Sequence, residues 1–171
     1  MSTSTGDTPD PPHPFSPQTE VIPAGTSVHR CHQLKYRPGE SNPGPNGAGR
    51  FHFFASRDVP AADVAALYFA QTPTAALCET ILRYTPEGSP SRLAPARYRN
   101  MAISELTLGR DLKMAMFHSE GLRTLDIMAG QLTDTTSDNY PQTRKWAEAA
   151  YSEGFDGLAW MSHQLNGRSS W

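Results

Sequence analysis

The chain has 171 residues, of which 37% are hydrophobic, so as one domain it can bury about two-thirds of its unfolded surface without metals or disulfides. Its 15 Lys and Arg residues against 17 Asp and Glu residues give a formal charge of -2 with no basic stripe, which argues against a binder of nucleic-acid backbones. No apolar run approaches the roughly 20 residues of a membrane-spanning helix.

The first segment, residues 1–24, is rich in Ser, Thr and Pro and poor in apolar side chains. Such a segment buries too little surface to offset the entropy lost on ordering, so it is predicted to be a disordered tail before a folded domain over 25–171. It lacks the charged start and apolar run of a secretory signal.

The cysteines Cys31 and Cys78 lie far apart and suggest no disulfide framework, so the expected location is the cytoplasm.

The first elements after the tail are predicted to be extended. Residues 27–32 have the composition of a short strand, and residues 50–54 are rich in β-prone aromatic side chains. Between them, the Gly- and Pro-rich residues 39–49 are predicted to form a mobile loop over a cleft. This loop lacks the Gly-Lys-Ser/Thr ending of a P-loop.

The middle of the chain predicts a strand, a tight turn and a helix. Residues 66–70 form an apolar run, and Thr72 followed by Pro73 is typical of an N-cap and a first helical position, so a helix is predicted over 73–84. Period-two alternation along the strand places Tyr68 opposite its two neighbours. Tyr68 therefore faces a cleft if those neighbours face the core.

The remaining chain alternates strands and helices. The predicted strands cover 98–108, 114–117 and 158–161. Residues 119–126 are predicted to be either a short helix or an irregular piece, and residues 142–152 a helix ended by Gly154 as a glycine after the C-cap. Strands outnumber helices and no repeat is visible. The pattern predicts a single mixed α/β (α+β) domain.

Glu79 is a lone carboxylate about two turns into the predicted helix, amid small and apolar neighbours. One interpretation is an exposed helical carboxylate that pairs with Arg83, four residues on. The other is a catalytic carboxylate, because a breaking glycosidic bond puts positive charge on the sugar and carboxylates stabilise that charge. Tyr68 would then place an aromatic hydroxyl on the adjacent strand.

Two arginines and one serine complete the candidate set. Arg30 and Arg50 are either edge-of-core cations or diphosphate ligands, since a planar guanidinium pairs two oxygens at once. Ser162 follows the last strand, where a serine is usually a cap or turn residue. No Gly-x-Ser-x-Gly elbow surrounds it, so it is not predicted to be a nucleophile.

A metal site is not predicted, although four potential ligands lie in this half of the chain. On a strand His29 and Cys31 face one way and His32 faces the other, and with His52 they show no tetrahedral spacing.

In the order Arg, Glu, Ser, the chain resembles the RES-domain family, which is named for those three residue types. The resemblance runs over about 29–167. It is carried by Gly-Arg-Phe around Arg50, by Leu-Tyr-Phe-Ala-x-Thr-Pro-x-x-Ala-Leu-x-Glu-Thr over 67–80, and by Gly-Phe-Asp-Gly before Ser162.

The resemblance implies an ADP-ribosyltransferase-like fold, in which helices flank a central, partly antiparallel β-sheet assembly, and NAD as the substrate. It implies that Arg30 and Arg50 contact the diphosphate and ribose, without assigning which does which, and that Tyr68 packs on the nicotinamide. Glu79 is implied to stabilise the ribosyl cation or orient the acceptor, and Ser162 to fix the ligand nearby.

The function implied is cleavage of the nicotinamide–ribose bond by a glycohydrolase or phosphorylase, with inorganic phosphate as the co-substrate in the second case. Such an enzyme would be the NAD-depleting toxin of a type II toxin–antitoxin pair, held by an antitoxin with a helix-turn-helix part. Neither nucleic acid nor membrane is an expected partner. Because relatives often continue into another strand beyond Trp171, an open sheet edge would favour self-association.

Three alternatives stay open at this point. The first is an ADP-ribosyltransferase that modifies a protein. The second is an NAD-binding module of the same fold without turnover. The third is an interaction protein that presents its Pro-rich tail to proline-reading domains.

Overall fold

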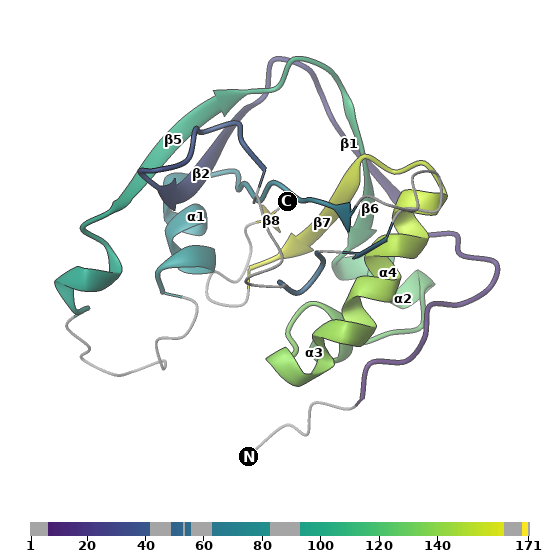
Figure 1. Ribbon diagram of the computed structural model, residues 1–171. Helices are drawn as coiled ribbons and strands as arrows, with labels where there is room; N and C mark the ends of the chain where they lie inside the picture. The colour runs from purple at the N-terminus through teal and green to yellow at the C-terminus, as the bar shows by residue number, and fades with distance from the viewer. Residues whose placement is uncertain are drawn as a thin grey trace.

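The computed structural model describes residues 7–41, 49–52, 54–55, 63–82, 93–162 and 169–170. Over these residues the chain forms the mixed α/β domain that its sequence predicts (Figure 1). The strands are β1 (Thr19–Ile22), β2 (Ser27–Gln33), β3 (Phe54–Ala55), β4 (Asp63–Val64), β5 (Met101–Thr107), β6 (Leu112–Phe117), β7 (Gly157–Met161) and β8 (Ser169–Ser170). The helices are α1 (Pro73–Thr80), α2 (Ser119–Thr124), α3 (Ala129–Leu132) and α4 (Tyr140–Ser152), with short 3-10 turns at Pro95–Arg97 and Ser137–Asn139.

The larger sheet has the strand order β1-β6-β7-β8. β6 runs parallel to β7 and antiparallel to β1, and β7 runs antiparallel to β8. A parallel pair needs a long crossover, and α2, α3 and α4 supply it between β6 and β7. β2 and β5 form a separate antiparallel pair that packs on α1, and Figure 1 shows this unit on one side of the molecule with β6, β7 and α4 on the other.

The main core lies between the larger sheet and α4. Trp146 of α4 and Phe117 of β6 are both buried, and their rings meet edge to face with centroids 6.1 Å apart. Ala147 and Ala150 bury the same face of α4, as the three- and four-residue spacing of an amphipathic helix requires. The helix ends where predicted, because Gly154 takes the positive φ of +75° that favours glycine.

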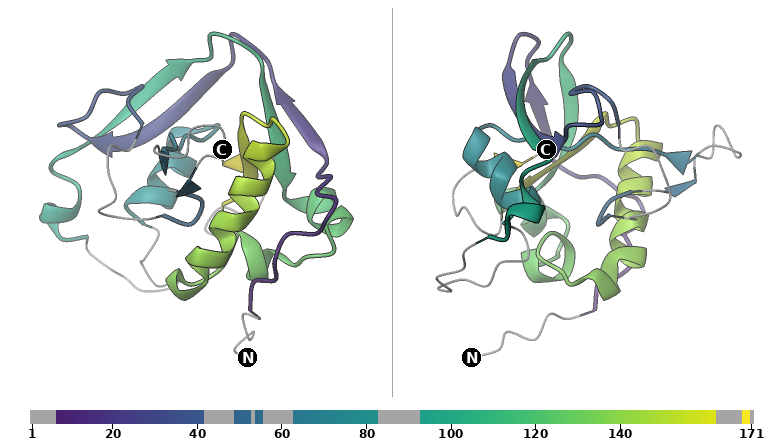
Figure 2. Two further views of the ribbon diagram at one scale, coloured as in Figure 1. Left: turned by 45° about the vertical axis from the view of Figure 1, so that its right-hand side comes forward. Right: turned by 60° about the vertical axis from the view of Figure 1, so that its left-hand side comes forward.

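The prediction of a disordered tail over 1–24 is wrong for residues 7–24. Phe15, 8% exposed, inserts its ring into the main core, and β1 adds an edge strand to β6. The indole N–H of Trp146 donates a 2.8 Å hydrogen bond to the carbonyl of Pro9, and the Thr8 hydroxyl donates to a carbonyl of α3. These contacts offset the conformational entropy that residues 7–24 lose on ordering. Composition alone does not show such contacts, and therefore predicts disorder. Figure 2 shows the segment running past α4 to β1.

The predicted strand over 66–70 is also wrong. Residues 66–69 form no strand, and within this segment only Ala70 pairs with another strand, through two 2.8 Å hydrogen bonds with the backbone of His29 in β2. The turn after it is as predicted, because the Thr72 hydroxyl accepts a 3.2 Å hydrogen bond from the amide of Ala75 at the start of α1.

The other boundaries differ by a few residues. The strand predicted over 98–108 is shorter at both ends as β5, and the helix predicted over 142–152 starts two residues earlier as α4. Of the residues predicted as strand over 50–54, Arg50 and Phe51 form a bend and Phe54 begins the short β3. Most of the predicted loop over 39–49 lies outside the described residues, as do the last two residues of the helix predicted over 73–84.

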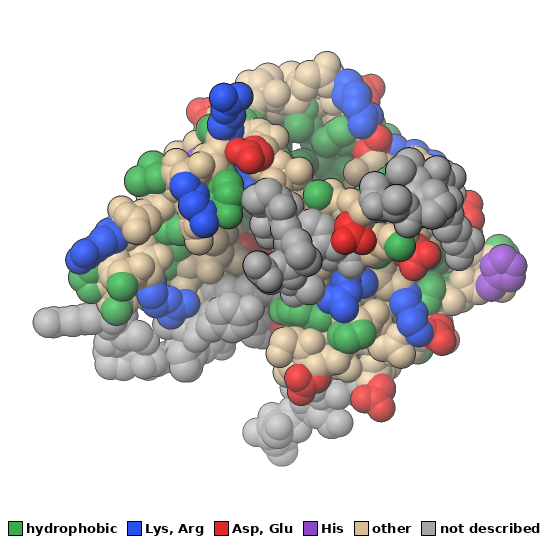
Figure 3. Space-filling view, viewed as in Figure 1, with side chains coloured by type: hydrophobic (Ala, Val, Ile, Leu, Met, Phe, Trp, Pro, Cys, Tyr) green, Lys and Arg blue, Asp and Glu red, His purple; other side chains and the backbone are tan. Residues whose placement is uncertain are grey.

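The surface of the described chain mixes both charge signs. Figure 3 shows Lys and Arg interspersed with Asp and Glu on the face that it presents. In the part of the chain that the structure describes, no helix combines the length and apolar character needed to cross a membrane.

Candidate functional site

Arg50 is buried at the start of α4. Its Nη2 donates a 3.4 Å hydrogen bond to the carbonyl of Thr135, and its guanidinium carbon lies 5.9 Å from the ring centroid of Tyr140. Its own carbonyl accepts a hydrogen bond from the hydroxyl of Thr143 in the first turns of the helix. Both the backbone and the side chain of Arg50 are therefore anchored to α4 and to the loop before it.

Tyr68 is half-buried between two aromatic neighbours. Its hydroxyl lies 2.7 Å from Nδ1 of His52, and its ring meets that of Trp160 in β7 edge to face, with centroids 5.6 Å apart. The sequence does not single out His52 as a partner of Tyr68, because 16 residues separate them and neither lies in a long strand. Its place two residues after Arg50 in the Gly-Arg-Phe motif is the one available signal.

Ser162 directly follows β7 and is 2% exposed. Its hydroxyl oxygen is buried and makes no hydrogen bond to any described residue. Alternation along an extended chain places Ser162 on the same side of β7 as Trp160, the side that Phe51 and Tyr68 cover. Three parts of the chain therefore meet on one side of this strand: the segment that contains Arg50, the Tyr68 ring and Ser162.

Glu79 lies near the end of α1 and is half-buried. The helix contacts β2, β5 and β8, and β8 pairs with the last two residues of β7, directly before Ser162. Burial raises the pKa of the neighbouring Cys78 thiol, and the negative charge of Glu79 raises that pKa further. Glu79 thus sits on a helix packed against the strand that adjoins the Ser162 position.

Arg30 stands apart from this group. It is 8% exposed, and its Nη1 donates hydrogen bonds to the carbonyls of Pro38 at 2.6 Å, Arg37 at 3.4 Å and Glu40. Burial lowers the pKa of Arg30, and the charge of Glu40 opposes the shift. The adjacent Cys31 packs with α1, so alternation directs the Arg30 side chain to the opposite face of β2 from that helix.

An apolar pocket of about 240 Å³ lies between residues 64–69, α4 and the β6–β7 pair. Among the site residues predicted from sequence, all of which the structure describes, Tyr68 alone lines it. Aromatic and aliphatic side chains make up most of its wall. The pocket shares Phe51, Tyr68 and Trp160 with the Ser162 side of β7, but no Lys or Arg of the described residues lines it, so a diphosphate group has no cationic partner in it.

The histidines considered as metal ligands make other contacts. Nδ1 of His29 lies 3.2 Å from the carbonyl of Gln71, and Nε2 of His32 lies 2.9 Å from the hydroxyl of Ser104. Within the described residues, no three His, Cys, Asp or Glu side chains come together in a way that could hold a metal ion.

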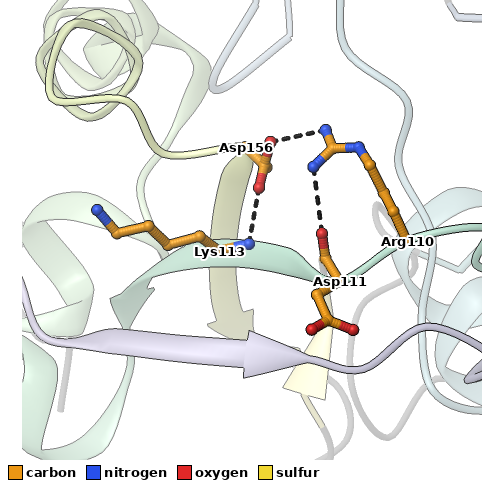
Figure 4. A network of polar contacts seen from close by, with 4 residues as sticks. All are labelled: Arg110, Asp111, Lys113 and Asp156. Atoms are coloured by element: carbon orange, nitrogen blue, oxygen red, sulfur yellow. Dashed lines mark hydrogen bonds and ion pairs between the residues drawn. The ribbon is translucent and has the colours of Figure 1, made fainter.

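The Gly-Phe-Asp-Gly motif forms the turn into β7. Asp156 accepts a 2.8 Å hydrogen bond from the amide of Lys113 in β6 and a 2.7 Å one from Nη2 of Arg110, as Figure 4 shows. These two bonds, that of Arg110 first, hold the pKa of Asp156 below its usual range. The motif fixes the start of β7, and because Ser162 directly follows β7, the motif also fixes the position of Ser162.

Asp156→Asn is expected to lower the free energy of unfolding by about 0.5–1 kcal/mol near neutral pH, since solvent screens the exposed Arg110 side of the pair. A folded-state pKa below the unfolded one gives stability that is present above the unfolded pKa and lost as pH falls through the folded pKa. Urea unfolding at about pH 7 and about pH 3 should therefore show the gap between parent and variant closing in acid. The exposed Asp138→Asn is the matched control, and a gap that widens in acid would contradict the assignment.

One comparison with known proteins agrees with the family resemblance of the sequence motifs. A family model described as the RES domain matches residues 27–170, which is most of the chain. Comparison with curated proteins and with solved structures finds no significant match.

Proposed function

Because the chain belongs to the RES-domain family, whose members are generally NAD-related, toxin-associated domains, we propose that it cleaves the nicotinamide–ribose bond of NAD. The observation that carries the proposal is the buried Ser162 hydroxyl, which makes no hydrogen bond to any described residue. Ser162 lies two residues after Trp160, against which Tyr68 packs, and directly after the β7 residues that pair with β8. A buried polar group without a partner costs about 1–3 kcal/mol, so a ligand that supplies the partner recovers that cost.

In the proposed reaction the bond between ribose C1 and the nicotinamide nitrogen breaks, and its electron pair leaves with neutral nicotinamide. The ribosyl cation that remains is stabilised by the carboxylate of Glu79. Tyr68 packs against the nicotinamide and Ser162 donates a hydrogen bond to the ligand. Holding the reactants in this arrangement supplies several kcal/mol of barrier lowering.

The two arginines have different positions in this scheme. Arg50 is linked to the Tyr68 and Ser162 side of β7 through its neighbour Phe51, which packs on Trp160, and Arg50 is the proposed diphosphate or ribose contact. Nη1 of Arg30 donates to three carbonyls of the 37–40 turn, so a phosphate that binds at this nitrogen competes with them. Arg30 is thus proposed to act as a clamp that trades loop contacts for ligand contacts.

Water or inorganic phosphate captures the ribosyl cation, which gives ADP-ribose with release of a proton, or ADP-ribose 1″-phosphate. We further propose that this activity makes the protein a cytoplasmic, NAD-depleting toxin restrained by an antitoxin. An antitoxin that reaches the Tyr68 and Ser162 side of β7 would block the substrate.

The test is incubation with NAD, with and without inorganic phosphate, and with a cell lysate. Release of nicotinamide is expected, and the mass of the second product distinguishes ADP-ribose, its 1″-phosphate and a modified protein. Ser162→Ala is expected to slow nicotinamide release by about tenfold through loss of one hydrogen bond, and Ser152→Ala at the exposed end of α4 is expected to leave it unchanged. Unchanged NAD after overnight incubation of the antitoxin-free protein would refute the activity.

A further inference from the structure

We propose that His52 is the residue that positions Tyr68, a role that the Arg-Glu-Ser pattern does not assign. Its kinetic consequence rests on the proposed NAD cleavage, whereas the contact itself does not. His52 is 5% exposed, and its Nδ1 lies 2.7 Å from the Tyr68 hydroxyl. The two rings also meet edge to face, with centroids 5.1 Å apart and planes at 62°.

Two contacts together fix the position of a phenol ring: a packing surface for the ring, here called the wall, and a hydrogen bond to the hydroxyl, here called the anchor. Trp160 supplies the wall, since its ring plane lies at 75° to that of Tyr68. His52 supplies the anchor at the other end. One O–H···N or N–H···O bond of 2.7 Å is at the short end of the ordinary range, whichever of the two atoms carries the proton.

The position of His52 is itself fixed by Gly49. A Cβ atom added at Gly49 would lie 2.3 Å from Cε1 and 2.7 Å from Nδ1 of the His52 ring, closer than real Cβ contacts come. The imidazole therefore packs directly against the backbone, in space that only glycine leaves free. On the other side of Arg50, Phe51 meets Trp160 with ring centroids 5.6 Å apart.

Each residue of the Gly-Arg-Phe-His segment, 49–52, makes a different structural contribution. Gly49 makes room, Arg50 attaches the segment to α4, Phe51 packs against Trp160, and His52 holds the hydroxyl of Tyr68. The same segment thus carries a proposed ligand contact and sets the orientation of a second one. His52 acts through Tyr68, and we infer that it is a positioning residue.

The direct test is nuclear magnetic resonance of protein labelled with ¹³C at tyrosine Cζ. The chain has 6 tyrosines, and the signal that disappears in Tyr68→Phe identifies Tyr68. His52→Leu removes the polar atom and is expected to shift the Tyr68 signal while the other signals stay in place. His52→Asn keeps a polar atom near the Nδ1 position and is expected to return the signal toward its parent value. A Tyr68 signal that is the same in all three proteins would overturn the proposal.

Nicotinamide release by the same variants measures the consequence for catalysis. His52→Leu is expected to lower kcat by about tenfold with KM within about twofold, and His52→Asn to recover most of the loss. His118→Asn is the matched control, because His118 is also partly buried but pairs with Glu20 at 2.8 Å, away from Tyr68. A shifted Tyr68 signal with unchanged kcat in an active protein would overturn the positioning role. If the parent does not consume NAD, the proposed function fails, and the tyrosine spectrum still decides the His52–Tyr68 link.

Discussion

Glu79→Gln is expected to lower the rate of nicotinamide release by about 100-fold or more, with little change in KM. The substitution keeps the size and shape of the side chain, removes its charge and replaces one acceptor oxygen by an NH2 donor. A ribosyl cation is charged only as the base departs, so a carboxylate stabilises the transition state more than the ground state. The partial burial of Glu79 strengthens that interaction relative to a fully solvated position.

The matched control is Glu120→Gln, the same change at an exposed carboxylate in the first turn of α2. It should leave nicotinamide release at the parent value. Thermal unfolding of both variants should stay close to that of the parent, because neither carboxylate is fully buried. An active, folded Glu79→Gln protein would remove the central element of the proposed mechanism.

Phe15→Ala is expected to lower the free energy of unfolding by about 3 kcal/mol, a large fraction of the stability of a domain this size. The ring meets Phe117 and Trp146 edge to face, with centroid distances of 6.5 Å and 5.9 Å. Its removal leaves a cavity between these two rings. The loss should appear as a lower urea midpoint with an unchanged slope.

Val21→Ala tests the same segment at a position that is 56% exposed. It should change the free energy of unfolding by no more than about 0.5 kcal/mol. A Phe15→Ala loss below about 1 kcal/mol would mean that the segment is not part of the core in solution. That result would restore the disordered tail predicted from composition.

The success and failure of the sequence predictions have the same physical origin. The N-cap at Thr72 and the glycine at Gly154 are local features, set by hydrogen bonds and dihedral angles within a few residues, and both are confirmed. The tail prediction fails because one aromatic side chain, Phe15, stands in a Pro-rich segment without any periodicity. Its partners, Phe117 and Trp146, lie more than a hundred residues away, and composition does not show them.

The same limit applies to residues 66–70, where apolar composition predicts burial but not a pairing partner. The run is partly buried, yet Ala70 alone pairs with β2. For the candidate site, motif order selects Arg50, Tyr68 and Ser162 as candidates. The fold packs Tyr68 and the Arg50 neighbour Phe51 against Trp160, two residues before Ser162. Motif order cannot show that Arg30 holds the 37–40 turn, because those bonds depend on how the chain folds back after β2.

The N-terminal segment also determines when the main core can be completed during synthesis of the chain. Thr19 pairs with Ala115, Thr8 donates to the carbonyl of Gln131, and Pro9 accepts from Trp146. Thr8, Pro9 and Thr19 are therefore synthesised well before the residues with which they pair. Such distant pairings make folding slow, so the core around Phe15 forms in a nascent chain only after Trp146 has left the ribosome.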